Sequence, residues 1–196
     1  MNDAWIQSAS GRVIDFDDID PTQIRTVDIA HSLSRINRYL GHTRTPYTVA
    51  EHCVRVSWLI EEWGHDRQMQ LRGLLHDAAE AYVGDTTAPV KRWIRRQTYA
   101  LDVLEERIER AILTRFGIAH MRSNPPLPMA EVERMHAIVK RADLVMLATE
   151  YRDLVLYRPR DWCLTEHPHH NGIVPMATAD GARDLFLDRL HALGAK

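Results

Sequence analysis

Helical periodicity beyond residue 28 is the feature that most limits what this chain can fold into. In the first such stretch, apolar residues recur at spacings of three and four: Ile29, Leu33, Ile36 and Leu40. This spacing places them on one face of a helix that spans about 28–40. No alternation of apolar and polar residues long enough for a strand follows residue 28. The sequence therefore predicts an all-α fold.

Start and stop signals mark the other helices. Thr48 and Glu51 have the spacing of a capping box, and Gly64 follows the last apolar residue of that stretch. Asp66 is placed to cap a third helix, which we expect to run without interruption to about Tyr82. A short helix begins at Pro89, and longer ones are expected over about 98–116, 129–156 and 179–193.

The predicted helices belong to a single domain. We assign residues 28–196 to a compact bundle of six or seven helices and residues 1–27 to a short hairpin or irregular N-terminal arm. A loop rich in Trp, His and Pro is expected over 157–175, before the last helix. A chain of 196 residues is long enough to bury a core of this kind.

Composition excludes several classes of protein. The formal net charge of −2 gives no field that would attract a nucleic acid polymer or an anionic membrane. Two cysteines are too few for a disulfide framework, and no apolar run approaches the roughly 18 residues that span a bilayer. The N-terminal residues lack the basic and apolar segments of a signal peptide. We therefore expect a cytoplasmic protein.

Eleven histidines are more than a chain of this size needs, and they point to metal binding. His76 and Asp77 are adjacent on the third predicted helix, so both reach one ion only if it lies close against that helix. His52 and Asp143 lie at the edges of the apolar stripes of two other helices. Two imidazoles and two carboxylates suit one divalent cation, and binding it would relieve the cost of burying them.

Each of these residues has a simpler interpretation when it is taken alone. A His-Asp dipeptide often occurs by chance, and His52 could be a hydrogen-bonded core histidine. Asp143 follows two basic residues and could pair with them on the surface. The joint arrangement favours the metal site, because three helices each offer a polar ligand from a core-facing position.

Further candidates surround the His-Asp pair. Glu80 shares the predicted helical face of His76 and Asp77, and Asp85 follows the end of that helix. A carboxylate one turn from a metal can orient the attacking water or take its proton. Gly73 lies one turn earlier on this face, where a missing side chain lets a neighbour or a ligand approach.

The motif series resembles that of the HD-domain phosphohydrolases. The matching segments are Ala50 to His52, Leu75 to Ala81, Gly84-Asp85 and Lys140 to Asp143. Their order, H…HD…D, is the defining pattern of that superfamily. The resemblance implies an HD-type bundle with one divalent metal ion (manganese, cobalt, zinc, iron or magnesium) held by His52, His76, Asp77 and Asp143.

The longer series, His-Asp-Ala-x-Glu followed by Gly-Asp and by Pro-Val-Lys, is similar to the bacterial 5′-deoxyribonucleotidases and related phage deoxynucleoside triphosphate hydrolases. This similarity implies that Glu80 and Asp85 position water and protonate the leaving group. Arg38 and Lys91 are implied to contact phosphate. Tyr39 stands where the family has a tryptophan that packs near the sugar, which leaves discrimination between deoxyribose and ribose open.

The resemblance thus implies a homodimeric enzyme that cleaves a deoxynucleoside monophosphate into deoxynucleoside and phosphate. Three alternatives remain: release of triphosphate from a dNTP, a nucleotide-binding module with little turnover, and a di-iron oxygenase, which needs more histidine ligands than we can place. His136 is expected in the core or beside the metal ligands. The cluster His167, His169 and His170 is expected to form a solvated loop or lid edge, with Trp162 covering the site.

Overall fold

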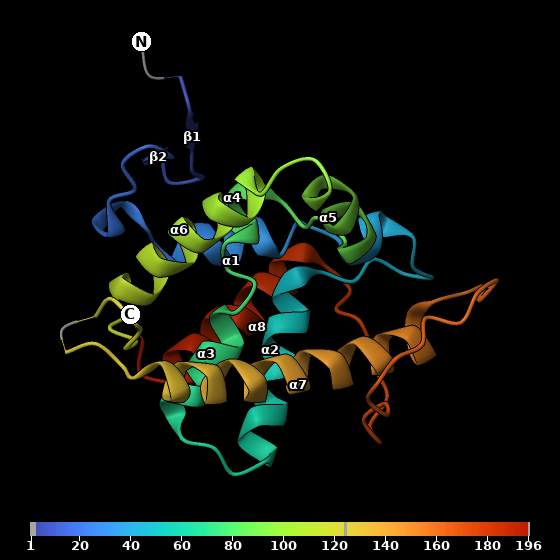
Figure 1. Cartoon of the computed structure of the whole chain (residues 1–196). Coiled ribbons are helices and arrows are strands. Elements are labelled where there is room, and N and C mark those ends of the chain that lie inside the picture. Colours follow the sequence, from blue (N-terminus) through green and yellow to red (C-terminus); the bar gives the residue numbers. More distant parts are fainter. Residues whose placement is uncertain (1–2, 124, 196) are drawn as a thin grey trace.

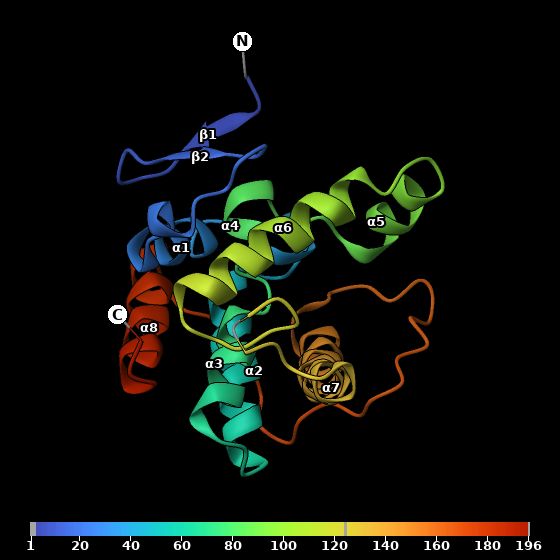
Figure 2. The same cartoon turned by 60° about the vertical axis from the view of Figure 1, so that its left-hand side comes forward.

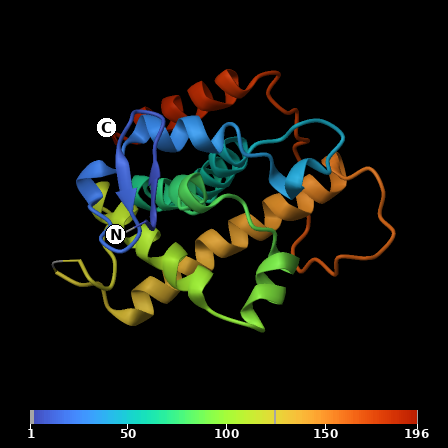
Figure 3. The same ribbon diagram turned by 90° about the horizontal axis from the view of Figure 1, so that it is seen from above.

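The computed structural model describes residues 3–123 and 125–195. Helices dominate this part of the chain, and its only sheet is a two-stranded hairpin, which confirms the predicted all-α class. Within the same residues, no helix is both long and apolar enough to cross a membrane. Figure 3 shows the N-terminal hairpin and the loop that joins the last two helices at opposite ends of the molecule.

The N-terminal arm is more ordered than an irregular segment. Its strands β1 (Trp5–Gln7) and β2 (Val13–Asp15) pair antiparallel, with Trp5 opposite Asp15. The turn between them is tied to the start of the first helix, because the Ser8 hydroxyl donates to Asp28 Oδ2 at 2.8 Å. The arm therefore packs on the helical domain through a polar contact.

The helices occur in the order expected. They are α1 (Thr26–Leu33), α2 (Val49–Glu62), α3 (Arg67–Leu75), α4 (Glu80–Val83), α5 (Ala88–Arg95), α6 (Ala100–Arg115), α7 (Met129–Leu154) and α8 (Ala179–Ala192). Two short 3-10 helices, η1 (Pro21–Gln23) and η2 (Arg38–Gly41), precede and follow α1. The predicted third helix is divided into α3 and the single turn α4, and the other helices of the described residues together with α3 make seven, within the predicted six or seven.

Helix α2 lies at the centre of the bundle. It packs against α3, α7 and α8, and Figures 1 and 2 show it between α7 and α8. The predicted capping box is present: Thr48 Oγ1 accepts from the Glu51 amide, and Glu51 Oε2 accepts from the Thr48 amide at 3.1 Å. Because Val49, Cys53 and Val56 are all fully buried, the face that carries His52 is directed into the interior.

The prediction of one continuous helix over 66–82 is wrong. After Leu75 the chain tightens, and the Ala78 amide bonds to the Leu75 carbonyl three residues back, as the Glu80 amide does to Asp77. Such i to i−3 bonds are typical of 3-10 turns, which end α3 before α4 begins. His76 and Asp77 therefore lie in a turn at the end of a buried helix, rather than on a regular helical face.

The prediction of a helix over 28–40 is also wrong in its second half. Helix α1 ends at Leu33, and the chain then forms a short antiparallel bridge between Asn37 and Thr48. The bridge is extended by the Val49 amide, which donates to the Ile36 carbonyl at 3.0 Å. A pairing partner far along the chain thus overrides the local apolar spacing, and it moves the following residues toward α2.

Gly73 has a close neighbour, as the sequence predicted, and this neighbour is helix α2 rather than a ligand. A Cβ at this position would overlap Ile60 Cδ1 and lie 3.5 Å from Ser57 Cα, so the glycine lets α3 pack closely on α2. We expect Gly73→Ala to lower the free energy of unfolding by about 1–2 kcal/mol, since overpacking outweighs the helix propensity of alanine.

Urea denaturation measures this effect, and a double-mutant cycle with Ile60→Val supplies the control. Because the valine lacks the overlapping methyl group, Gly73→Ala should cost less in the Ile60→Val background than in the wild type. Equal costs in the two backgrounds would contradict the steric explanation.

Candidate metal centre

The four predicted ligand side chains meet at one point, where His52 is fully buried and the other three are partly exposed. His52 comes from α2, His76 and Asp77 from the turn after α3, and Asp143 from α7. His52 Nε2 lies 3.3 Å from His76 Nε2 and 3.3 Å from Asp143 Oδ1. Asp77 Oδ2 lies 3.1 Å from His76 Nε2 and 3.6 Å from His52 Nε2. The donor atoms of His52, His76 and Asp143 lie within 4.8 Å of one another and could hold a single cation, and Asp77 adds a carboxylate beside His76.

Both imidazoles are oriented by their second ring nitrogen. His52 Nδ1 donates to Glu150 Oε1 at 2.6 Å, and His76 Nδ1 donates to the Gly73 carbonyl at 2.8 Å. Each Nε2 is thereby directed toward the common point, where it can bind a cation once it is unprotonated. Metal-binding histidines in proteins are held in this way by a carboxylate or a backbone carbonyl.

Glu150 is a residue of this site that the sequence analysis missed. It is fully buried on α7, where it accepts hydrogen bonds from His52, from Arg38 Nε at 3.0 Å and from the Tyr39 hydroxyl. It lies seven residues after Asp143, so two helical turns place both carboxylates on the same face of α7. This spacing was the signal in the sequence that could have identified it.

Charges in the site favour a cation. Burial alone would raise the pKa of Asp77, but the adjacent His76 imidazole brings it below its ordinary value of 3.8. Burial likewise opposes ionisation of Asp143, yet His52 lowers its pKa. The pKa of His52 is raised from 6.5, because Glu150 and Asp143 outweigh burial and Arg38. A cation that binds here must displace protons from the imidazoles, so acid competes with it.

Cys53 adds a thiol to this environment. The sequence analysis treated it as a small buried apolar residue, and it is fully buried. Its sulfur also lies within 4.8 Å of ligand atoms of His76 and Asp77. Burial raises the pKa of the thiol above 9.0, so it is held in its protonated, weakly ligating form.

Glu80 and Asp85 lie close to the ligands and can hold protons. Glu80 is buried, and its Oε2 has no hydrogen-bond partner in the described part of the chain. Burial and the nearby Asp77 raise the pKa of Glu80 to about 9. Burial also raises the pKa of Asp85, although Arg38 opposes this. Carboxyl groups with raised pKa values can exchange protons with a reacting molecule near neutral pH.

Arg38 borders the candidate ligands. Its Nη1 lies 3.5 Å from Asp77 Oδ2, while its Nε is held by Glu150. The next residue, Tyr39, has φ +58°, a left-handed conformation that is uncommon for a residue with a side chain. Trp162 packs on Tyr39 at 5.9 Å and on Tyr151 at 4.6 Å between ring centroids, so it covers these rings rather than the metal ligands.

Lys91 lies in α5 and is already engaged. Its ammonium group lies 2.9 Å from Glu105 Oε1 of α6, with about a fifth of each side chain exposed. The charge of Lys91 also acts on Glu80, which indicates that it lies near the rim of the site. Lys91 therefore lies near Glu80 but is already paired with Glu105.

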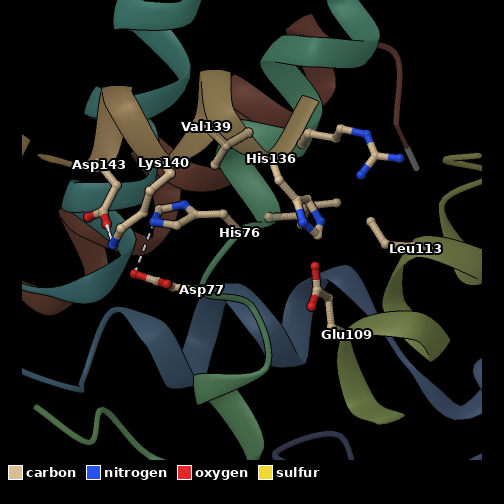
Figure 4. Close-up of a pocket in the computed structure, with 10 residues that line it drawn as sticks. His76, Asp77, Glu109, Leu113, His136, Val139, Lys140 and Asp143 are labelled. Atoms are coloured by element: carbon tan, nitrogen blue, oxygen red, sulfur yellow. Dashed lines mark hydrogen bonds and ion pairs between the residues drawn. The ribbon is translucent and has the colours of Figure 1, made fainter. Parts of the chain in front are cut away.

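A pocket of about 380 Å³ opens beside the metal ligands (Figure 4). Asp143 lines it and forms an ion pair of 2.7 Å with Lys140, so the surface pairing considered for this aspartate also occurs. His136 was expected in the core or beside the ligands, but it is exposed and lines the pocket instead. The full lining is Arg72, Leu75, His76, Asp77, Glu109, Leu113, His136, Val139, Lys140 and Asp143.

The second histidine cluster lies in the loop after α7. His169 Nε2 lies 3.0 Å from Glu62 Oε2 at the end of α2, and the His169 amide donates to Thr149 Oγ1 at 2.8 Å. His170 stacks beside His169 at 4.2 Å between ring centroids, and His167 is exposed. These contacts anchor an irregular, mostly exposed loop, as the sequence predicted.

Comparison with known proteins places the chain among bacterial relatives. No model of a known protein family matches it. It is 33% identical over 193 residues to the uncharacterized protein YfdR of Escherichia coli, with 97% of this chain and 96% of YfdR aligned. It is 35% identical over 154 residues to the uncharacterized protein RCAP_rcc00048 of Rhodobacter capsulatus, with 76% and 72% aligned. Since similarity to YfdR extends over nearly the whole of both chains, the protein belongs to the YfdR family.

Proposed function

We propose that the protein is an HD-type, metal-dependent phosphohydrolase whose substrate is a deoxynucleoside monophosphate. The observation that carries this proposal is the meeting of His52, His76, Asp77 and Asp143 at one point beside the pocket. Two imidazoles and two carboxylates from three parts of the fold form a ligand set that suits one divalent cation. The H…HD…D order of these residues supports the HD assignment.

The residues around this point can carry out ester hydrolysis. Water adds to phosphorus, the bond from phosphorus to the 5′-oxygen breaks, and the deoxynucleoside leaves as an alcohol with inorganic phosphate as the second product. A divalent ion held by the four ligands supplies Lewis acidity for the phosphate. Arg38 neutralises phosphate charge beside Asp77. Glu80 and Asp85 take the proton from water and return one to the 5′-oxygen.

Two observations favour a monophosphate over a triphosphate. Lys91 is paired with Glu105, which leaves it less available for additional phosphate charges. The pocket of about 380 Å³ is at the small end of the range for ligand sites, which suits one compact nucleotide. The product of the reaction separates the two substrates, since a triphosphatase releases triphosphate rather than phosphate.

We further propose that the enzyme is cytoplasmic and forms a homodimer. Trp93 on α5 and Trp5 in β1 are 63% and 49% exposed, and large exposed apolar side chains are typical of contact surfaces. Sedimentation equilibrium would measure the oligomeric state directly.

An activity screen of the purified protein tests the function. Each deoxynucleoside mono- and triphosphate, and each ribonucleotide, is incubated with manganese, cobalt, zinc or magnesium, and the phosphate product is identified by chromatography. We expect inorganic phosphate from deoxynucleoside monophosphates, and no release after chelation of the metal. Tight nucleotide binding without product under every metal would favour a binding module instead.

A further inference from the structure

The pocket has a second polar end, away from the metal ligands. Glu109 of α6 and His136 of α7 point toward each other there, whereas Asp77 and Asp143 lie at the opposite end (Figure 4). Glu109 is half-buried and His136 exposed, and the side chain of neither makes a hydrogen bond to any of residues 3–123 and 125–195. Side chains that face a pocket with unused donors and acceptors are available to a ligand.

Part of the pocket lining is apolar. Leu75, Leu113 and Val139 line the pocket from three different parts of the fold. Flat apolar walls with a few polar groups at one end are how proteins commonly enclose a single nucleobase, whose edge is read by hydrogen bonds.

The distance between the two ends suits a mononucleotide. His136 and Asp143 are seven residues apart on α7, which corresponds to roughly 10 Å along the helix axis. A phosphate held near Asp143 would therefore place a base near His136, with the sugar between them. Lys140 lies on the same helix between these two positions.

Building on the proposed function, we propose that Glu109 determines base specificity and selects guanine. Its carboxylate has two acceptor oxygens, which match the adjacent N1–H and exocyclic amino group of guanine. Adenine, cytosine and thymine do not present such a pair of neighbouring donors on this edge. His136 can donate a ring N–H to the guanine carbonyl oxygen.

The surroundings of Glu109 leave its carboxyl oxygens free to accept hydrogen bonds from a ligand. Burial raises its pKa above 4.5, while His136 and Arg72 act in the opposite direction. Arg72 is fixed nearby, because its guanidinium donates to the Ala119 carbonyl. The carboxylate thus has the Arg72 guanidinium and the His136 ring nearby, but no hydrogen bond from the described residues.

Steady-state kinetics with dGMP, dIMP and dAMP test this inference. Hypoxanthine differs from guanine only by the missing exocyclic amine, so wild-type kcat/KM should favour dGMP over dIMP at least about tenfold. Glu109→Gln should reduce that ratio to within about threefold, because an amide nitrogen faces the amine in place of an acceptor. Glu106→Gln, an exposed position one turn earlier on α6, should retain the wild-type ratio.

The outcomes separate this inference from the proposed function. If the wild type hydrolyses all three nucleotides equally, or Glu109→Gln lowers all three equally, the specificity role is overturned and the hydrolase remains. If no nucleotide is hydrolysed, the hydrolase is overturned. Calorimetric titration with dGMP and dIMP then tests whether the pocket binds guanine selectively. Tighter binding of dGMP than of dIMP, lost in Glu109→Gln, would support the selection of guanine by Glu109. Equal binding of the two nucleotides by the wild type would overturn it.

Discussion

Asp77→Ala should abolish metal binding and lower kcat for nucleotide hydrolysis by at least about a thousandfold, because a Lewis-acid metal supplies several kcal/mol of transition-state stabilisation. Asp77 is central to the site: its carboxylate lies 3.1 Å from His76, 3.6 Å from His52 and 3.5 Å from Arg38. Its loss removes one ligand and also the negative charge that holds the imidazoles and the guanidinium together.

Metal content by mass spectrometry and turnover of the preferred nucleotide measure this effect. Asp188→Ala is a matched control, since Asp188 is exposed on α8, away from the ligands. It should retain wild-type metal content and activity. Full turnover by a metal-stripped Asp77→Ala protein would refute the metal centre.

Glu150→Gln should weaken metal binding roughly 10- to 100-fold and destabilise the fold by about 3 kcal/mol. The carboxylate of Glu150 orients His52 and neutralises the nearly buried guanidinium of Arg38. An amide can accept from only one of these donors through its oxygen, and it carries no charge, so Arg38 is left without its buried counter-ion. Isothermal titration with manganese and urea denaturation measure the two effects.

The pH dependence of stability follows from the same contacts. Although burial opposes ionisation, Arg38 and His52 hold the pKa of Glu150 at about 2, below its ordinary 4.5. A carboxyl group with a lowered pKa stabilises the fold above its unfolded pKa, and this contribution disappears as pH falls through the folded value. The difference in unfolding free energy between metal-free wild type and Glu150→Gln should therefore shrink between pH 4.5 and pH 2.

Glu133→Gln is the control for both measurements, because Glu133 is an exposed residue of the same helix, α7. It should match the wild type in metal affinity and in stability at every pH. A Glu150→Gln protein with unchanged manganese affinity would show that His52 does not depend on this carboxylate for its orientation.

The helical class and most helix boundaries were predictable because their causes are local. The capping box of Thr48 and Glu51 and the proline at the start of α5 act within one turn of the chain. The errors arose where distant residues decide the backbone. The bridge from Asn37 to Thr48 ended the predicted first helix, and the 3-10 turn at His76 divided the predicted third.

The candidate site likewise has residues that local patterns indicate and residues that only contacts between distant segments bring together. The sequence indicated His52 and Asp143 because each lies at the edge of an apolar stripe, and His76 and Asp77 because they are adjacent and complete the H…HD…D order. Sequence alone also determined that the chain forms helices and where most of them begin. Only the tertiary structure decided that Glu150 and Arg38 pair beside those ligands, and that Glu109 faces His136. These partners are far apart along the chain, and no local spacing encodes how helices pack on one another.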